Sequence, residues 1–182
     1  MISTIEQFDL QSLQEVGEYK VLKKGDYFVK EGSICQEVAY VISGIFRSFY
    51  HSSEDEEITY CFRYPQSFIA GYSSFITGNP SMENMQAITD AEIFIIPKSK
   101  ALEIQNSSMY WMRFFKEIAE LEFCELEKRI FLLQKEKAEK RYADLMENHP
   151  EYLKEIPLNY LASYLGISQR HLSRIRKEFP FK

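Results

Sequence analysis

The chain has 182 residues and a net charge of −5, and its apolar content of 45% is ordinary for a soluble protein. This length suffices for one large domain or two small ones with a sizeable core. No apolar run approaches the roughly 18 residues that cross a bilayer, no N-terminal segment has the pattern of a signal peptide, and the three cysteines are too widely spaced for a disulfide framework, so we expect a cytoplasmic protein with no membrane contact.

The first half of the chain is predicted to be mostly β-structure. Residues 3–16 form one exception, since Ser3 or Thr4 can cap a short helix with an apolar face. From residue 19 to Pro97 the chain shows short β-branched and aromatic runs separated by turn signals. Strands of this length and spacing indicate a small sandwich or barrel. The clearest predicted strands span residues 38–42, 45–50 and 92–96.

A long helix is predicted after a helical turn at residues 98–104. It begins at a cap, Ser107 or Ser108, and ends near Gln134. One apolar stripe on it has the spacing of a coiled-coil seam and is the predicted dimer interface: Met112, Ala119, Phe123, Leu126, Ile130 and Leu133. A second stripe comprises Phe114, Ile118, Leu121 and Phe131. The β domain could cover one stripe and a second copy of the chain the other, or both could be buried within one monomer.

The last part of the chain, "LASYLGISQRHLSRIRKEF" (161–179), fits a helix–turn–helix. Pro157 suits the start of the first helix, and Gly166 can take the positive φ that ends it. Ser168 can cap the second helix, whose Leu172 and Ile175 would face the first. The residues predicted to face outward are Gln169, Arg170, His171, Ser173, Arg174 and Lys177.

The second helix is basic although the protein is acidic. Residues 168–182 contain five cations and one acidic residue, a net charge of +4, which leaves −9 for the rest of the chain. This distribution suits a site-directed DNA reader, although a solvated helix end would also carry such charges. Arginine can pair with guanine and glutamine with adenine, so Gln169, Arg170 and Arg174 are assigned to bases. Contacts with phosphates, or roles that the pattern leaves open, are assigned to Ser168, His171, Arg176 and Lys177.

Over nearly its whole length the chain resembles the Crp/Fnr-type transcription regulators. The segment "LKKGDYFVKEGSICQEVAYVISGIFRSFY" (22–50) resembles the first half of the family's cyclic-nucleotide-binding β-roll, and residues 68–99 resemble the second half. Residues 108–134 are similar to the central dimerising helix, and "AEKRYADLMENHPEYLKEIPLNYLASYLGISQRHLSRIRK" is similar to the DNA-binding domain.

The resemblance implies an α+β fold with three parts. These are a jelly-roll-like, double-stranded β-roll sensor at residues 1–106, a dimerisation helix at 107–135, and a helix–turn–helix domain at 136–182 that lacks a full wing. It implies a homodimer that reads a palindromic DNA operator through helix 168–178, with RNA polymerase as a further partner. Half-sites would lie about 34 Å apart, and changes in the β-roll would reorient the two recognition helices.

Two departures bear on the effector. Nucleotide-binding members carry a glutamate just after the glycine that matches Gly71 and an arginine followed by serine or threonine; here Tyr72 follows Gly71, and the second motif reads Ser81–Met82–Glu83. Because Glu83 would repel a phosphate and no cation replaces the arginine, we expect no binding of cyclic AMP in the usual mode and no cofactor. The degenerate pocket would comprise Phe62, Gly71, Tyr72, Ser73, Ser74, Ser81, Met82 and Glu83. Its serines could hold a neutral ligand, or the pocket could simply be packed.

Other functional classes have little support. An iron–sulfur sensor needs four clustered ligands, and a haem sensor needs an axial ligand, for which His51 in a polar turn is a weak candidate. We find no catalytic triad order, metal cluster or glycine-rich phosphate loop in the sequence, so an enzyme is not expected, and the acidic run at residues 54–57 is predicted to be a solvated turn. The alternative function is a small-molecule-sensing module whose tail does not bind DNA.

Overall fold

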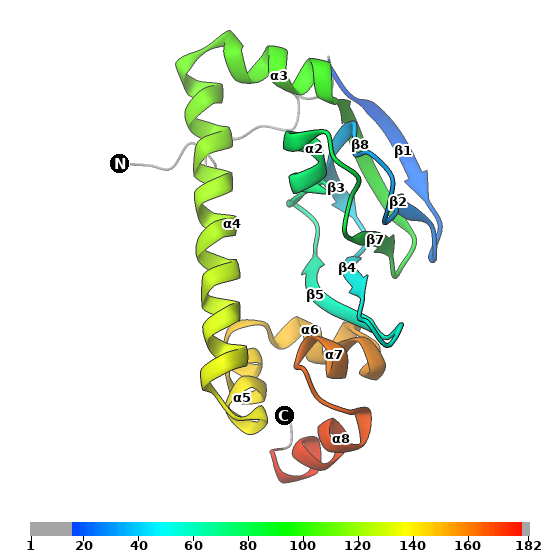
Figure 1. The fold of residues 1–182 in the computed structure, drawn as a ribbon, viewed down its shortest axis with the longest axis vertical. Coiled ribbons are helices and arrows are strands. Elements are labelled where there is room, and N and C mark those ends of the chain that lie inside the picture. Colours follow the sequence, from blue (N-terminus) through cyan, green and yellow to red (C-terminus); the bar gives the residue numbers. More distant parts are fainter. Residues whose placement is uncertain (1–15, 180–182) are drawn as a thin grey trace. The chain divides into compact units, whose positions relative to one another are not determined.

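The computed structural model describes residues 16–179 (Figure 1). The predicted helix at residues 3–16 therefore lies almost wholly outside the described residues. Between residues 16 and 97 the structure has eight strands: β1 (Glu18–Leu22), β2 (Tyr27–Val29), β3 (Glu37–Ser43), β4 (Phe46–His51), β5 (Glu57–Arg63), β6 (Phe68–Ile69), β7 (Asn84–Ala87) and β8 (Ala91–Pro97). One short helix, α2 (Tyr72–Thr77), interrupts them. No helix within residues 16–179 has the length and apolar character to cross a membrane.

The strands form two four-stranded sheets, in the orders β1-β8-β3-β6 and β2-β7-β4-β5. Strand β3 pairs antiparallel with β8, which places Val41 opposite Ile93 and Ala39 opposite Ile95. Alternate residues of these strands point to one face, and both sheets contribute to the buried apolar cluster there: Leu22, Val29, Cys35, Ala39, Val41, Phe46, Ile69, Met85, Ala87, Ala91, Ile93 and Ile95. The predicted β-roll, with its three clearest strands, is confirmed.

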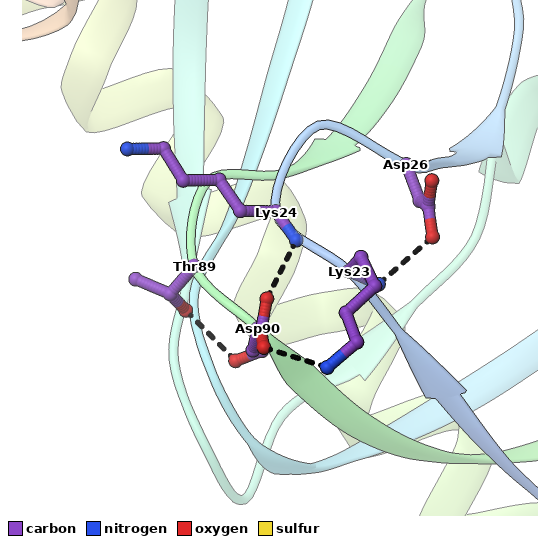
Figure 2. Close-up of polar contacts among 5 residues, drawn as sticks. All are labelled: Lys23, Lys24, Asp26, Thr89 and Asp90. Carbon is purple, nitrogen blue, oxygen red and sulfur yellow. Dashed lines mark hydrogen bonds and ion pairs between the residues drawn. The ribbon is translucent and has the colours of Figure 1, made fainter.

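The turns at one end of this core are fixed by close backbone contact and by one carboxylate. Gly44 has φ +90°, and a Cβ there would lie 2.5 Å from Cβ of Ala91, so only glycine fits without displacement. Figure 2 shows the Asp90 carboxylate bridging the Lys23 ammonium at 2.9 Å and the Lys24 backbone amide at 2.9 Å. These two donors, the Lys24 amide most of all, hold the pKa of the Asp90 carboxyl below its usual range.

A second apolar cluster lies on the other face of β3 and β8. Val38, Tyr40 and Ile96 pack there with Ala101 of helix α3 (Lys98–Ser107). The predicted helical turn at residues 98–104 is therefore a ten-residue helix. Its position follows from the alternation of β3, which is apolar on both faces and so needs a cover on each.

The long helix α4 (Met109–Lys135) follows directly, as predicted. The Ser108 hydroxyl accepts a hydrogen bond from the Trp111 amide at 3.3 Å and so caps it. Phe114 is buried and packs edge-on against Phe68, 5.7 Å between ring centroids.

Many other apolar residues on α4 are exposed in one chain. Leu121 and Phe131 of the second stripe are each 57% exposed. Five members of the predicted seam are exposed as well: Met112, Phe123, Leu126, Ile130 and Leu133. Both stripes being buried inside one monomer is therefore contradicted, and this helix keeps an apolar surface that one chain leaves in solvent.

Four short helices complete the described chain: α5 (Ala138–Asn148), α6 (Pro150–Glu155), α7 (Leu158–Tyr164) and α8 (Gln169–Glu178). The chain divides into two compact units, one of Met1–Tyr50 with Cys61–Leu121 and the other of His51–Tyr60 with Glu122–Lys182. The acidic run 54–57 lies in and beside the turn between β4 and β5, as predicted. The tip of this hairpin therefore belongs to the same unit as the C-terminal helices, which the sequence did not predict.

Candidate nucleic-acid interface

Helices α7 and α8 form the predicted helix–turn–helix. Leu161 and Ala162 of α7 are buried together with Leu172 and Ile175 of α8. Ala162 is small, which suits the crossing point of two closely packed helices. Gly166 between them has φ +64°, the left-handed conformation that ends a helix without strain only in glycine. The predicted turn chemistry is confirmed at this position.

Helix α8 begins at Ser168, whose side chain accepts a hydrogen bond from the His171 amide at 3.2 Å. Pro157, by contrast, lies one position before the first residue of α7, as its cap. Five residues of α8 are exposed: Gln169, Arg170, Arg174, Lys177 and Glu178. Ser173 is half-buried. Because Leu172 and Ile175 face inward, this exposed set occupies the opposite side of the helix, where three cations stand against one acidic residue, Glu178.

Two of the residues that the sequence assigns to phosphates or to open roles, His171 and Arg176, lie beside helix α5. His171 places its Nε2 atom 3.7 Å from Oε1 of Glu139, and both side chains are about one-third to two-fifths exposed. The Glu139 pKa is lowered mainly by its own backbone amide, with smaller contributions from His171 and Arg174. Burial raises the pKa of Tyr142, while the neighbouring Arg176 guanidinium opposes that rise. His171 and Arg176 therefore lie beside Glu139 and Tyr142 of α5.

The end of α7 is held by two arginines that sequence reasoning missed. Arg129 of α4 donates to the Tyr164 carbonyl at 2.7 Å, and its guanidinium lies 3.8 Å from the centroid of the Tyr164 ring. Arg141 of α5 donates to the Leu165 carbonyl at 3.0 Å. Carbonyls at a helix end have no partner within the helix, so these cations satisfy them and complement the helix dipole. Neither contact has a signal in the local sequence, because each joins residues at least 24 positions apart.

The predicted effector pocket surrounds helix α2. Ser74 is buried, and its hydroxyl accepts from the Cys35 amide at 2.9 Å and donates to the Asn79 carbonyl at 2.5 Å. The buried Ser81 hydroxyl donates to the Glu83 carbonyl at 3.0 Å. A Cβ on Gly71 would lie 3.1 Å from Cγ1 of Val29. The hydroxyls of Ser74 and Ser81 are thus engaged by the chain itself.

The remaining pocket candidates differ in their exposure. Tyr72, Ser73 and Met82 are exposed, Glu83 is half-buried, and Phe62 is buried on strand β5. Helix α2 ends at Gly78 in the left-handed conformation. Its last turn is stabilised by Lys98, which donates to the Phe75 carbonyl and lies over the Phe75 ring. A lysine bound to a carbonyl in this way is a helix cap rather than a phosphate ligand.

Comparison with known proteins identifies the two parts of this architecture. Residues 19–108 match the family model described as "Cyclic nucleotide-binding domain". The chain is therefore a cyclic nucleotide-binding-type β domain joined through a long helix to a helix–turn–helix. This is the fold of the Crp/Fnr-type transcription regulators, and the resemblance of the sequence to that family is confirmed.

Three solved structures illustrate the likeness. FixK2 from Bradyrhizobium japonicum superposes with a TM-score of 0.79 at 18% identity, over 90% of this chain and 84% of that one. A CooA variant from Carboxydothermus hydrogenoformans gives 0.74 at 15% identity, over 98% and 84%. A Crp/Fnr-family transcriptional regulator from Eubacterium rectale gives 0.72 at 19% identity, over 96% and 84%. No curated protein matches the sequence significantly.

Proposed function

We propose that the protein is a sequence-specific DNA-binding transcription regulator of the Crp/Fnr type that reads its operator with helix α8. The observation that carries the proposal is the surface of α8. Its apolar side is fixed in the fold by Leu172 and Ile175, while Gln169, Arg170 and Arg174 stand in solvent near its first turns. A recognition helix enters the major groove with its N-terminal residues directed at base edges, and this is where those side chains lie.

The exposed residues have different assigned roles. Arg170 and Arg174 can each donate two parallel hydrogen bonds to guanine, and Gln169 can pair with adenine. Lys177 lies near the end of α8, where a point charge suits a phosphate. Ser168 remains assigned to the backbone, because the N-terminal turn that it caps presents free amides. His171 and Arg176 lie beside α5, so their proposed role is to orient α8 rather than to contact a base.

A homodimer is the second part of the proposal. In one chain the Phe123 side chain of the α4 seam is 65% exposed, and Leu126 and Ile130 are about half exposed. Burial of such a surface against a second copy would stabilise a pair at about 25 cal/mol per Å² of apolar area removed from water. A two-fold pair carries two α8 helices, which matches a palindromic operator with half-sites about one helical turn apart.

The effector pocket is proposed to be degenerate and closed to cyclic AMP. The hydroxyls of Ser74 and Ser81 are used internally, Tyr72 follows Gly71, and the Glu83 carboxylate would oppose a phosphate. Thermal unfolding with millimolar cyclic AMP tests this, since a ligand at 100 times its Kd stabilises by about 2.7 kcal/mol. We expect no change in the midpoint, and a clear rise would show that the pocket accepts the nucleotide by another mode.

Selection from a random pool of duplex DNA tests the function itself. The full-length protein should enrich a palindromic sequence, and Arg170→Ala combined with Arg174→Ala should abolish that enrichment. Lys20→Ala, at an exposed position of β1, is the control for a change of charge outside α8. Enrichment of no sequence, or equal enrichment by the double variant, would contradict the proposal. Transcription in vitro from a selected template would then test the expected interaction with RNA polymerase.

A further inference from the structure

Strand β5 lies at the edge of its sheet, next to β4. An edge strand presents a row of backbone N–H and C=O groups to whatever lies beside it, and native proteins cover or block such edges. Here residues 57–60 belong to the same compact unit as helices α5 to α8. Two side chains from helices, Ser163 and Arg129, form hydrogen bonds with backbone groups of this strand.

The first is Ser163 of α7. Its hydroxyl accepts a hydrogen bond from the Thr59 amide at 2.8 Å and donates one to the Glu57 carbonyl at 2.9 Å. Residues 57 and 59 direct these groups to the same side of the strand, as the period of two requires. A single serine hydroxyl therefore supplies the acceptor and the donor that a neighbouring strand would otherwise provide.

The second is Arg129 of α4. One nitrogen, Nη2, donates to the Thr59 carbonyl at 3.2 Å and to the Tyr164 carbonyl at 2.7 Å. The guanidinium also stacks on the Tyr164 ring, 3.8 Å from its centroid. This planar cation thus joins the edge of β5 to the last turn of α7, and lysine, which has no planar face, cannot reproduce the stacking on the Tyr164 ring.

Together these contacts hold α7, the first helix of the helix–turn–helix, to the backbone of strand β5. Helix α7 is followed after Leu165, Gly166 and Ile167 by the capped start of α8, and their apolar faces pack on one another. Any tilt of α7 is consequently a tilt of α8. Strand β5 runs without interruption from Glu57 to Arg63, so the covalent chain that Ser163 and Arg129 hold leads directly out of this unit into the first.

We propose that Ser163 and Arg129 are positioning residues that lock α7 to the edge of β5 and so set the orientation of α8 on DNA. The positioning role rests on the proposed function, but the lock itself does not. Neither side chain needs to touch DNA. Since both bind backbone groups, the lock depends on the path of β5 rather than on its side chains.

Hydrogen exchange of the Thr59 amide, followed by NMR in the full-length protein without DNA, tests the lock. In Ser163→Ala this amide loses its acceptor, and we expect exchange about five- to tenfold faster than in the wild type. Ser163→Thr retains the hydroxyl and should stay near the wild-type rate. Asn159→Ala, at an exposed position of the same helix, is the matched control. Equal Thr59 exchange in Ser163→Ala and the wild type would overturn the proposal.

Binding to a selected duplex and to a scrambled duplex of equal length tests the positioning role. Ser163→Ala and Arg129→Lys conserve charge, so non-specific affinity should change less than about twofold, whereas specific affinity should fall about fivefold. Lys128→Arg, at the exposed neighbouring position, should change neither. A merely structural role would lower both affinities together and would overturn the positioning role. Failure of the wild type to prefer any duplex would overturn the proposed function, and Thr59 exchange would still decide whether the lock forms.

Discussion

The charge of Lys177 provides a quantitative test of the assigned interface. This residue is exposed on α8, and we assign it to a phosphate. Each phosphate contact contributes about −0.9 to the slope of log K against log salt concentration, because neutralised phosphates release their counterions. A homodimer carries two copies, so Lys177→Ala should make the slope less steep by about 1.8.

This change of slope has a measurable consequence. Between 50 and 200 mM salt, a fourfold range, the affinity ratio of wild type to variant should shrink by about twelvefold for a dimer and by about 3.5-fold for a monomer. Fluorescence anisotropy on one selected duplex, at five or six salt concentrations, measures both values. Gln169→Ala is uncharged and should weaken specific binding with no change of slope, because base readout carries no counterion release.

Two outcomes would refute this reasoning. An unchanged slope in Lys177→Ala would show that Lys177 does not contact a DNA phosphate. An equal change in Lys20→Ala, on strand β1, would show that the net charge of the protein rather than the surface of α8 governs binding.

Three further predictions concern the fold and its assembly. Gly44→Ala should lower the free energy of unfolding by about 2 kcal/mol or more in urea titration, because the new Cβ would clash with Ala91. Gly25→Ala, also at positive φ but with no atom near its Cβ, should cost about 1 kcal/mol, and equal losses would contradict the steric argument. The pKa of Asp90 is lower in the folded protein, so the ionised carboxylate stabilises the fold above the unfolded-state pKa near 4, and this stabilisation is lost as pH falls through the folded-state pKa. Asp90→Asn should therefore lose less free energy of unfolding than the wild type between pH 5 and pH 3, and equal losses would exclude this linkage. Phe123→Glu should convert a dimer to a folded monomer in sedimentation equilibrium, since this side chain is 65% exposed in one chain, and an unchanged mass would exclude the seam.

The local elements could be predicted from the sequence where one side chain decides the backbone. Gly166 and Ser168 define the turn and the start of α8 through conformational freedom and a capping hydroxyl, and both act within a few residues. The seam of α4 follows from spacing alone. The outward set of α8 could be predicted only in part, because the helical period does not say that α5 lies beside His171 and Arg176.

The domain division illustrates the same limit. The sequence predicts boundaries near residues 106 and 135. The compact units of the structure divide within α4, after Leu121, and the hairpin tip His51–Tyr60 belongs to the unit of the C-terminal helices. Hydropathy and turn signals report on local burial, and they hold no information about which unit a polar hairpin tip joins. The predicted boundaries stay a prediction about folding units, and the structure adds which segments pack together.

The sequence by itself determined the order of elements, the basic surface of the last helix and the loss of the phosphate-binding pattern around Gly71, since each depends on residue type and short spacing. Only the tertiary structure decided that the hydroxyls of Ser74 and Ser81 form hydrogen bonds within the chain, and that Ser163 and Arg129 form hydrogen bonds with the backbone of β5. The physical reason is that a hydrogen bond to a backbone group does not depend on the type of the residue to which that backbone group belongs. Every peptide unit offers the same donor and acceptor, so the partner is chosen by the fold rather than by the sequence around it.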